Sequence, residues 1–167
     1  MVRAQGKEAN EMGCKDRLED YLRENRVPFE AQQHPRAVAA QEVAASEHIP
    51  GKMLAKTVMV LAGGEMIMLA LPAPYQVDLE KAAVALGAND ARLAEEEEFE
   101  NTFSDCEIGA MPPFGNLYDV PVFVDKSLAE DEVIVFRAGT HTETMSVGYA
   151  DFERLVEPTV AEFARRN

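Results

Sequence analysis

Apolar residues fall at helical spacing in one stretch of the chain and at strand spacing in the next, so the chain is predicted to alternate between helices and strands. Leu18, Tyr21 and Leu22 lie three or four positions apart within residues 15–25, which predicts a short amphipathic helix. Residues 27–32 follow as an edge strand, because a proline with no N–H for a ladder stands near the start.

A glycine pair divides two apolar runs and predicts a β-hairpin. Residues 57–62 and 65–71 are almost continuously apolar, as is typical of buried strands. Gly63-Gly64 between them suits a two-residue hairpin turn, because such turns need positive φ and glycine adopts it readily.

The remaining periodic segments complete the predicted domain. Further helices are expected at residues 40–48, 79–86, 95–103 and 152–156, the last restarting after Pro158, and further strands at 91–93, 120–125, 132–138 and 141–147. Asp78 and Asp151 are the expected N-caps of two helices. Because strands occur both in hairpins and between helices, residues 14–167 are predicted to form one α/β domain on a mixed, largely antiparallel sheet. Residues 1–13 lack apolar periodicity and are predicted to be a mobile tail.

Composition and charge limit the kinds of function that this chain can have. The chain has 167 residues, of which 47% are hydrophobic and 28% charged, and this suits one globular domain. Its net charge of −14 argues against indiscriminate nucleic-acid binding, because affinity for phosphates comes mostly from Lys and Arg. Recognition of one strand end through a small local basic patch stays compatible with this charge.

The sequence has few features of a membrane protein, a disulfide-rich protein or a metal-binding protein. No apolar run is long enough to cross a bilayer, and the first residues lack the apolar stretch of a secretory signal. Cys14 and Cys106 do not make a disulfide framework, so a cytoplasmic location is the simplest expectation. The histidines (His34, His48 and His141) have no paired ligand spacing, so neither a metal site nor a cofactor is expected.

Residues 106–115 form a loop rich in glycine and proline within a charge-rich chain. Gly109 and Gly115 permit backbone angles or close approaches that a side chain would block, and Pro112-Pro113 stiffens the middle. One interpretation is a cradle of backbone N–H groups for an oxyanion or a phosphate. The other is a tight helix-to-strand connection in which Phe114 fills the core.

Three side chains have both a chemical and a structural interpretation. Lys56 enters a buried strand, where its ammonium can hold a phosphate or a carboxylate, or simply reach solvent along the strand edge. His141 follows Gly139-Thr140 and is either a base or donor toward a substrate, with Thr140 adding a hydroxyl, or an exposed turn histidine. Asp125 orients a partner or starts a turn, and Cys106 has no neighbour that would activate its thiol.

Seven segments in order resemble the YbaK/ProX family of aminoacyl-tRNA deacylases, which is related to the editing domain of bacterial prolyl-tRNA synthetases. They are Val27-Pro28-Phe29-Glu30 with His34-Pro35, Gln41-Glu42-Val43-Ala44, Ala55-Lys56-Thr57-Val58, Val77-Asp78-Leu79, the loop from Gly109 to Gly115, the strand at 121–125, and Ala138-Gly139-Thr140-His141. Each segment alone is a weak signal, and their order and spacing over residues 15–156 carry the resemblance. It implies a single domain around a mixed, barrel-like sheet with helices packed outside.

The resemblance also implies an activity, namely hydrolysis of the ester that joins a wrong amino acid to the terminal adenosine of a tRNA. The residue matching Lys56 and the loop matching Gly109 to Pro113 line the site in this family. We therefore expect Lys56 to hold the phosphate or sugar of the terminal nucleotide, and the N–H groups of Gly109 and Ala110 to stabilise the oxyanion. With no nucleophile evident, a water would attack with help from the free ribose hydroxyl.

The expected substrate is tRNA that carries a small amino acid, since His141 resembles the prolyl-editing and alanine-specific branch of the family. Alanine is favoured, with serine, threonine or cysteine as further options, and tRNA-Pro is the expected carrier. The expected substrate-binding residues are Met53, Leu54, Met111, Pro113, Phe114, Thr140 and Asp125, and a basic patch of Arg36, Lys52, Lys56, Lys81 and Arg137 would meet the acceptor end. A synthetase is a possible recruiting partner.

Two other functions remain open from the sequence. The chain could be a non-catalytic module that binds an aminoacyl or nucleotide ligand, or docks on a synthetase. It could also hydrolyse a different small ester or amide.

Overall fold

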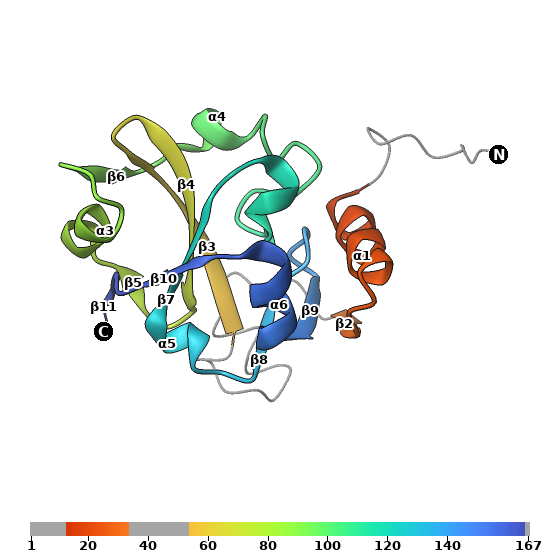
Figure 1. Cartoon of the computed structure of the whole chain (residues 1–167). Coiled ribbons are helices and arrows are strands. Elements are labelled where there is room, and N and C mark those ends of the chain that lie inside the picture. Colours follow the sequence, from red (N-terminus) through yellow and green to blue (C-terminus); the bar gives the residue numbers. More distant parts are fainter. Residues whose placement is uncertain (1–12, 34–53, 166–167) are drawn as a thin grey trace.

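A mixed β-sheet organises the computed structural model, which describes residues 13–33 and 54–165 (Figure 1). Its strands run in the order β10 (Thr159–Ala161), β7 (Val122–Asp125), β4 (Glu65–Pro72), β3 (Leu54–Ala62), β8 (Val133–Arg137), β9 (Glu143–Gly148) and β2 (Phe29–Gln33), and β6 (Ala91–Leu93) also pairs with β3. The pairs β3–β8, β4–β7 and β7–β10 are parallel and the others are antiparallel. The prediction of one α/β domain on a mixed sheet is confirmed.

The predicted hairpin lies at the centre of this sheet. β3 and β4 pair continuously from Ala55↔Pro72 to Ala62↔Glu65, and Gly63 and Gly64 turn the chain with φ of +59° and +82°. Along β4, Met68 faces one hydrophobic core and Leu69 faces another, and this alternation extends through the strand. Both faces of the hairpin are therefore covered, which explains the continuous apolar sequence.

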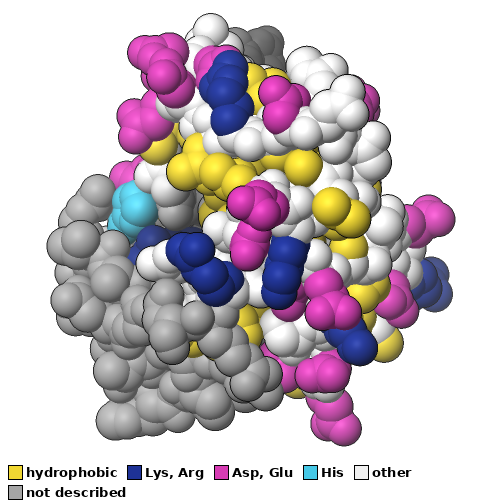
Figure 2. All heavy atoms as spheres, turned by 90° about the vertical axis from the view of Figure 1, so that its left-hand side faces the viewer, with side chains coloured by type: hydrophobic (Ala, Val, Ile, Leu, Met, Phe, Trp, Pro, Cys, Tyr) yellow, Lys and Arg dark blue, Asp and Glu magenta, His cyan; other side chains and the backbone are white. Residues whose placement is uncertain are grey.

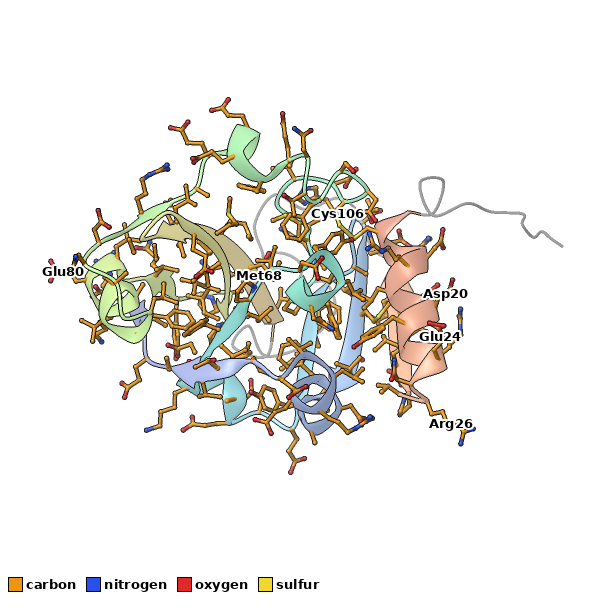
Figure 3. All side chains as sticks on the ribbon, turned by 45° about the horizontal axis from the view of Figure 1, so that its top comes forward. Asp20, Glu24, Arg26, Met68, Glu80 and Cys106 are labelled. Atoms are coloured by element: carbon orange, nitrogen blue, oxygen red, sulfur yellow. A yellow bond between two sulfur atoms is a disulfide. The ribbon has the colours of Figure 1, made fainter. Side chains whose placement is uncertain are left out.

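The larger core lies under α1 (Cys14–Glu24) and α6 (Tyr149–Val156). Phe114 is at its middle, with ring centroids 5.5 Å from Phe136 and 5.4 Å from Phe152. Figure 3 shows Met68 in the interior, whereas Asp20 on α1 points away from the body of the molecule.

The smaller core lies under α3 (Leu79–Ala85), on the opposite side of the sheet (Figure 1). As predicted, Asp78 caps this helix by accepting hydrogen bonds from the N–H groups of Glu80 and Lys81. Phe163 fills the same core from the C-terminal segment, where β11 (Ala164–Arg165) pairs with β5 (Gln76–Val77).

Several element boundaries differ from the predictions. The helix expected at 95–103 is only α4 (Glu96–Phe99), because polar residues that favour turns follow it, although Phe99 and Phe103 are both buried. A short α5 (Lys126–Ala129) lies between β7 and β8, and η3 (Gly115–Tyr118) follows the glycine–proline loop. The helix expected at 40–48 and nearly all of the tail expected at 1–13 lie outside the described residues.

The C-terminal predictions are wrong in two respects. α6 begins at Tyr149 with Gly148 as N-cap, so Asp151 lies in its first turn rather than at its cap. No helix restarts after Pro158, because Glu157 leaves the helix with φ of +51° and the chain becomes β10, paired in parallel with β7.

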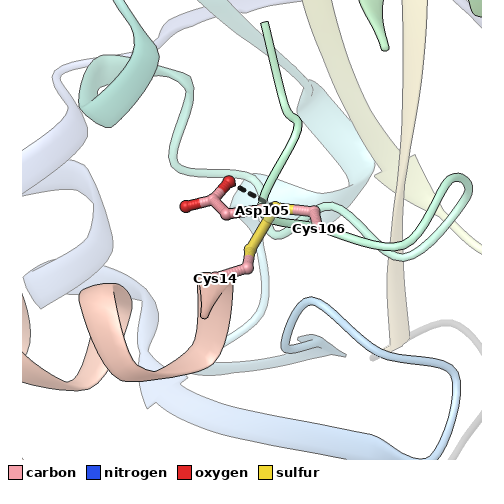
Figure 4. Close-up of side chains that lie close together, drawn as sticks. All are labelled: Cys14, Asp105 and Cys106. Atoms are coloured by element: carbon pink, nitrogen blue, oxygen red, sulfur yellow. Dashed lines mark hydrogen bonds between the residues drawn. A yellow bond between two sulfur atoms is a disulfide. The ribbon is translucent and has the colours of Figure 1, made fainter. Parts of the chain in front are cut away.

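A disulfide joins Cys14 at the start of α1 to Cys106 at the start of the glycine–proline loop (Figure 4). The prediction that Cys14 and Cys106 do not make a disulfide framework was wrong. The fold brings their Cα atoms to 5.0 Å although 92 positions of sequence separate them. The N–H of Cys14 donates to the carbonyl of Asp105 at 3.0 Å, which anchors the helix start there. Within the described ranges, no helix is both long enough and apolar enough to span a membrane.

Candidate functional site

A narrow pocket brings the first half of β3 together with the glycine–proline loop. Its lining residues come from β3, the loop and β8, and they are Leu54, Ala55, Lys56, Thr57, Gly109, Met111 and Arg137. Four of the residues predicted for the site therefore meet here, namely Lys56, Leu54, Gly109 and Met111. Met53, which was also predicted, lies outside the described residues.

The loop enters the pocket through a tight turn. The N–H of Ala110 donates to the carbonyl of Glu107 at 3.0 Å, and Gly109 between them has φ of +85°. That value suits the third position of a type II turn, where glycine is favoured. Gly115, at the end of the loop, allows a close approach, because a Cβ there would lie 2.6 Å from the carbonyl oxygen of Val120.

Hydrogen bonds hold this turn from two sides. The N–H of Glu107 donates to the carbonyl of Gly139 at 2.8 Å, and the N–H of Gly139 donates back to the carbonyl of Ala110 at 2.9 Å. From β3, the Thr57 hydroxyl donates to the carbonyl of Met111 at 3.0 Å. The loop is therefore fixed in place before any ligand binds, as an oxyanion site requires.

His141 lies against the loop. Its backbone N–H donates to the Glu107 carboxylate at 2.7 Å, and its ring Nε2 lies 2.8 Å from the carbonyl oxygen of Ile108. A carbonyl can only accept, so Nε2 carries a proton in this arrangement. His141 lies in the turn before β9 rather than in the strand predicted at 141–147, and in this position it holds the loop.

Only one of the two predicted oxyanion donors remains available. The N–H of Ala110 is used within the turn, and its side chain is fully buried. The assignment of Ala110 as a donor is therefore corrected. Within the part of the chain that the structure describes, the N–H of Gly109 donates to no acceptor.

Lys56 is half-buried and has no carboxylate beside it among the described residues. Burial lowers the pKa of its ammonium, and no acidic group among the described residues opposes that shift. A cation held in this way favours an anionic ligand, because such a ligand restores the interaction that water and counter-charges would otherwise supply.

Four predicted substrate-binding residues lie away from the pocket. Phe114 is in the core with 0% exposure, and Pro113 beside it is buried, so the core interpretation of this part of the loop is the correct one. Thr140 hydrogen-bonds to the carboxylate of Glu143 at 3.1 Å. Asp125 was predicted either to orient a partner or to start a turn, and it caps the short helix α5 instead. It also accepts hydrogen bonds from the N–H groups of Phe163 and Ala164.

The predicted basic patch is divided. Arg137 lies with Lys56 at the pocket, whereas Lys81 on α3 lines a separate, larger groove of about 680 Å³ beside β10. Figure 2 views the side of the molecule that carries α3, where hydrophobic side chains gather among basic and acidic ones. Arg36 and Lys52 fall in the range that the structure does not describe.

The described residues contain one grouping of metal-ligand types, made of Cys14, Asp105 and Cys106 (Figure 4). Both sulfurs are in the disulfide, which leaves no thiolate to bind a metal.

Comparison with known proteins identifies the family. Residues 34–155 match the family model of the aminoacyl-tRNA editing domain. The chain belongs to this family. It is 33% identical over 110 residues to a proline–tRNA ligase of Acidithiobacillus ferrooxidans, a match covering 62% of this chain and 18% of the ligase. It is also 32% identical over 101 residues to the multifunctional Ser/Thr-tRNA deacylase ProXp-y of Escherichia coli K12, a match covering 59% of each chain.

A solved structure supports the same fold. The crystal structure of a candidate trans-editing enzyme for prolyl tRNA synthetase matches with a TM-score of 0.78 at 19% identity, over 92% of this chain and 98% of that one. The resemblance drawn from the sequence motifs is confirmed, as is the predicted fold class.

Sequence reasoning gave Glu107 no role, although its backbone and side chain both hold the editing-domain loop. An acidic residue next to a cysteine carries no periodic signal, and its partners, Gly139 and His141, lie more than 30 positions away. Arg137 was named only as part of a patch. Its position could have marked it as a candidate site residue, because it is a single cation at the end of the apolar run of β8.

Proposed function

We propose that this editing domain hydrolyses the ester between a wrong amino acid and the terminal adenosine of a tRNA, acting in trans. The observation that carries the proposal is the meeting of Lys56 and Gly109 at one pocket whose loop is held in place by His141 and Thr57. A cation for the nucleotide and a free backbone N–H for the ester carbonyl are the two groups that this hydrolysis needs.

Each group has a distinct role in the proposed reaction. Lys56 binds the phosphate or sugar of the terminal nucleotide and so places the ester beside the loop. A water attacks the carbonyl carbon, and the N–H of Gly109 stabilises the oxyanion that forms. The bond to the ribose oxygen then breaks, and that oxygen takes a proton. The free ribose hydroxyl assists the water, because no side-chain nucleophile is assigned.

His141 supports this chemistry by holding the carbonyl of Ile108, which belongs to the same turn as Gly109. Fixed donors stabilise a developing charge more strongly than mobile ones, because they need no reorganisation during the reaction. His141 therefore acts as a positioning residue in the proposed mechanism.

The proposed substrates carry small side chains. Leu54 and Met111 give the pocket an apolar wall, and both are almost fully buried. The relative from Escherichia coli is named a Ser/Thr-tRNA deacylase, and the ligase relative acts on proline. We therefore extend the proposal to alanine, serine, threonine or cysteine on tRNA-Pro or a similar tRNA, with a synthetase as the recruiting partner.

The test is deacylation of tRNAs charged with alanine, cysteine, serine, threonine and proline by the purified chain. Hydrolysis of one or two of these, with the others intact, supports the proposal and names the substrate. If a known deacylase cleaves its substrate in parallel and this chain cleaves none, the chain is a binding module or works only with its synthetase. Equal cleavage of free aminoacyl esters would instead indicate a general esterase.

A further inference from the structure

Arg137 lies next to Lys56 on the same face of the sheet. The parallel ladder between β3 and β8 pairs Leu54 with Val135 and Ala55 with Phe136. The same register places Lys56 opposite Arg137 at the next position. Both side chains line the pocket, whereas Phe136 turns the other way into the core. Two cations are thus adjacent in a chain whose net charge is −14.

The guanidinium of Arg137 has unused donors. Its Nε and Nη2 atoms are buried, and neither has a hydrogen-bond partner among the described residues. Burial lowers the pKa of Arg137, as it does for Lys56, and no acidic group within residues 13–33 and 54–165 raises it. By contrast, Arg17 is paired with Asp105 at 3.2 Å and Arg92 with Glu98 at 2.8 Å.

Buried N–H groups of a guanidinium are unfavourable when they have no hydrogen-bond partner, unless a ligand accepts hydrogen bonds from them. Nε–H and Nη2–H point in the same direction from one edge of the guanidinium plane. That edge is the fork with which arginine binds two oxygens of a phosphate or a carboxylate at once. The two donors of Arg137 that lack a partner in the described part of the chain are therefore the two that a bidentate anion would use.

We propose that Arg137 and Lys56 form one anion site that binds a phosphodiester of the tRNA acceptor end, with Arg137 supplying the bidentate contact. This inference rests on the proposed function for the identity of the ligand. In an aminoacyl-tRNA the amino acid's carboxyl group is esterified and its amino group is positive, so the nearby anions are phosphates. The two cations hold the nucleotide, and the aminoacyl group is directed toward the loop that carries Gly109.

The inference also accounts for tRNA binding by an acidic chain. Two adjacent cations provide a strong local site without a basic surface, and such a site holds only a strand end.

The test compares two substrates that differ in phosphate. One is mischarged tRNA, and the other is the same amino acid esterified to adenosine, which has no phosphate. Arg137→Gln should raise KM for the tRNA about 10- to 100-fold, in keeping with the loss of charged hydrogen bonds, and leave cleavage of the phosphate-free ester unchanged. Arg137→Lys should recover part of the loss. Arg23→Gln, which removes an exposed positive charge, should leave the cleavage of both substrates unchanged.

Thermal unfolding separates a binding role from a structural one. Because Arg137 has no protein partner among the described residues, Arg137→Gln should keep or raise the melting temperature. A large fall in melting temperature, or an equal loss of activity on both substrates, would overturn the inference.

Binding of ligands that carry no amino acid distinguishes a failure of the anion site from a failure of the proposed hydrolysis. The dinucleotide cytidylyl-adenosine, which contains a phosphodiester, should bind the wild-type chain more tightly than adenosine does, and Arg137→Gln should abolish the difference. If the wild type cleaves no charged tRNA but shows this difference, the anion site stands and the proposed activity fails. If the wild type cleaves tRNA and Arg137→Gln alters neither KM nor dinucleotide binding, the anion site is refuted.

Discussion

Replacing Asp125 by asparagine should destabilise the protein and leave the chemistry of the pocket unchanged. Asp125 is 6% exposed, and its carboxylate accepts hydrogen bonds from four donor groups. One oxygen accepts from the N–H groups of Phe163 and Ala164, both at 2.9 Å, and the other accepts from the N–H and hydroxyl of Ser127 at 3.0 and 2.5 Å. Asparagine replaces one oxygen with an NH₂ group, which meets two donors and accepts from neither.

The size of the effect follows from those bonds. Hydrogen bonds to a charged group contribute about 1.5 kcal/mol or more each, so losing two lowers the free energy of unfolding by about 3 kcal/mol. For a domain of this size, this corresponds to a melting temperature lower by roughly 6–12 °C.

The difference between Asp125→Asn and wild type should depend on pH. Burial alone would raise the pKa of Asp125, but the hydrogen bonds from Phe163, Ser127 and Ala164 outweigh burial and lower it. A carboxylate with a lowered pKa stabilises the fold at pH above its unfolded value of about 3.9, and this stabilisation is lost as pH falls through the folded value. The two proteins should therefore differ fully at pH 7 and converge below about pH 4.

Denaturant unfolding and deacylation per folded molecule measure the two effects. Asp78→Asn is the matched control, because asparagine also caps helices well and the free energy of unfolding should change by only a few tenths of a kcal/mol. An Asp125→Asn protein with wild-type stability and little activity would refute this reasoning and return Asp125 to the site.

Three further predictions concern the disulfide, the loop and charge. Cys14→Ser should lower the free energy of unfolding by about 4–5 kcal/mol, because the disulfide closes a loop of 92 residues. In denaturant unfolding, a reductant should destabilise the wild type but have no effect on Cys14→Ser. Gly109→Ala should reduce deacylation at least tenfold, because φ of +85° strains alanine in the loop, whereas Gly64→Ala, with φ of +82° in the hairpin, should lower stability alone. Deacylation by the wild type should slow as salt rises, and a rate independent of salt would count against phosphate contacts.

Local patterns predicted much of the fold. The hairpin around Gly63-Gly64, the capped helix after Asp78 and the edge strand β2 all depend on neighbouring residues. The C-terminal segment was predicted incorrectly, because whether residues 159–161 form a helix or a strand depends on pairing with β7. That ladder partner lies more than 30 positions away, and no local period reports it.

The site was predictable only in part. Lys56 and Gly109 were identified by resemblance to a family rather than by a spacing rule, and the structure brings them to one pocket. Phe114 and Asp125 were given binding roles that their burial and hydrogen bonds contradict. Burial and partners of this kind are properties of the folded chain, and so is the contact between Arg137 and the pocket.

The most direct test of the proposed editing activity compares deacylation of mischarged tRNA by the wild type, Lys56→Ala and Lys126→Ala under single-turnover conditions. Lys126 is exposed on α5 and lies outside the Lys56 pocket, so it controls for the loss of one positive charge. We predict that the wild type and Lys126→Ala cleave the same charged tRNA at similar rates and that Lys56→Ala loses most of the activity. Near-normal turnover by Lys56→Ala would contradict the account.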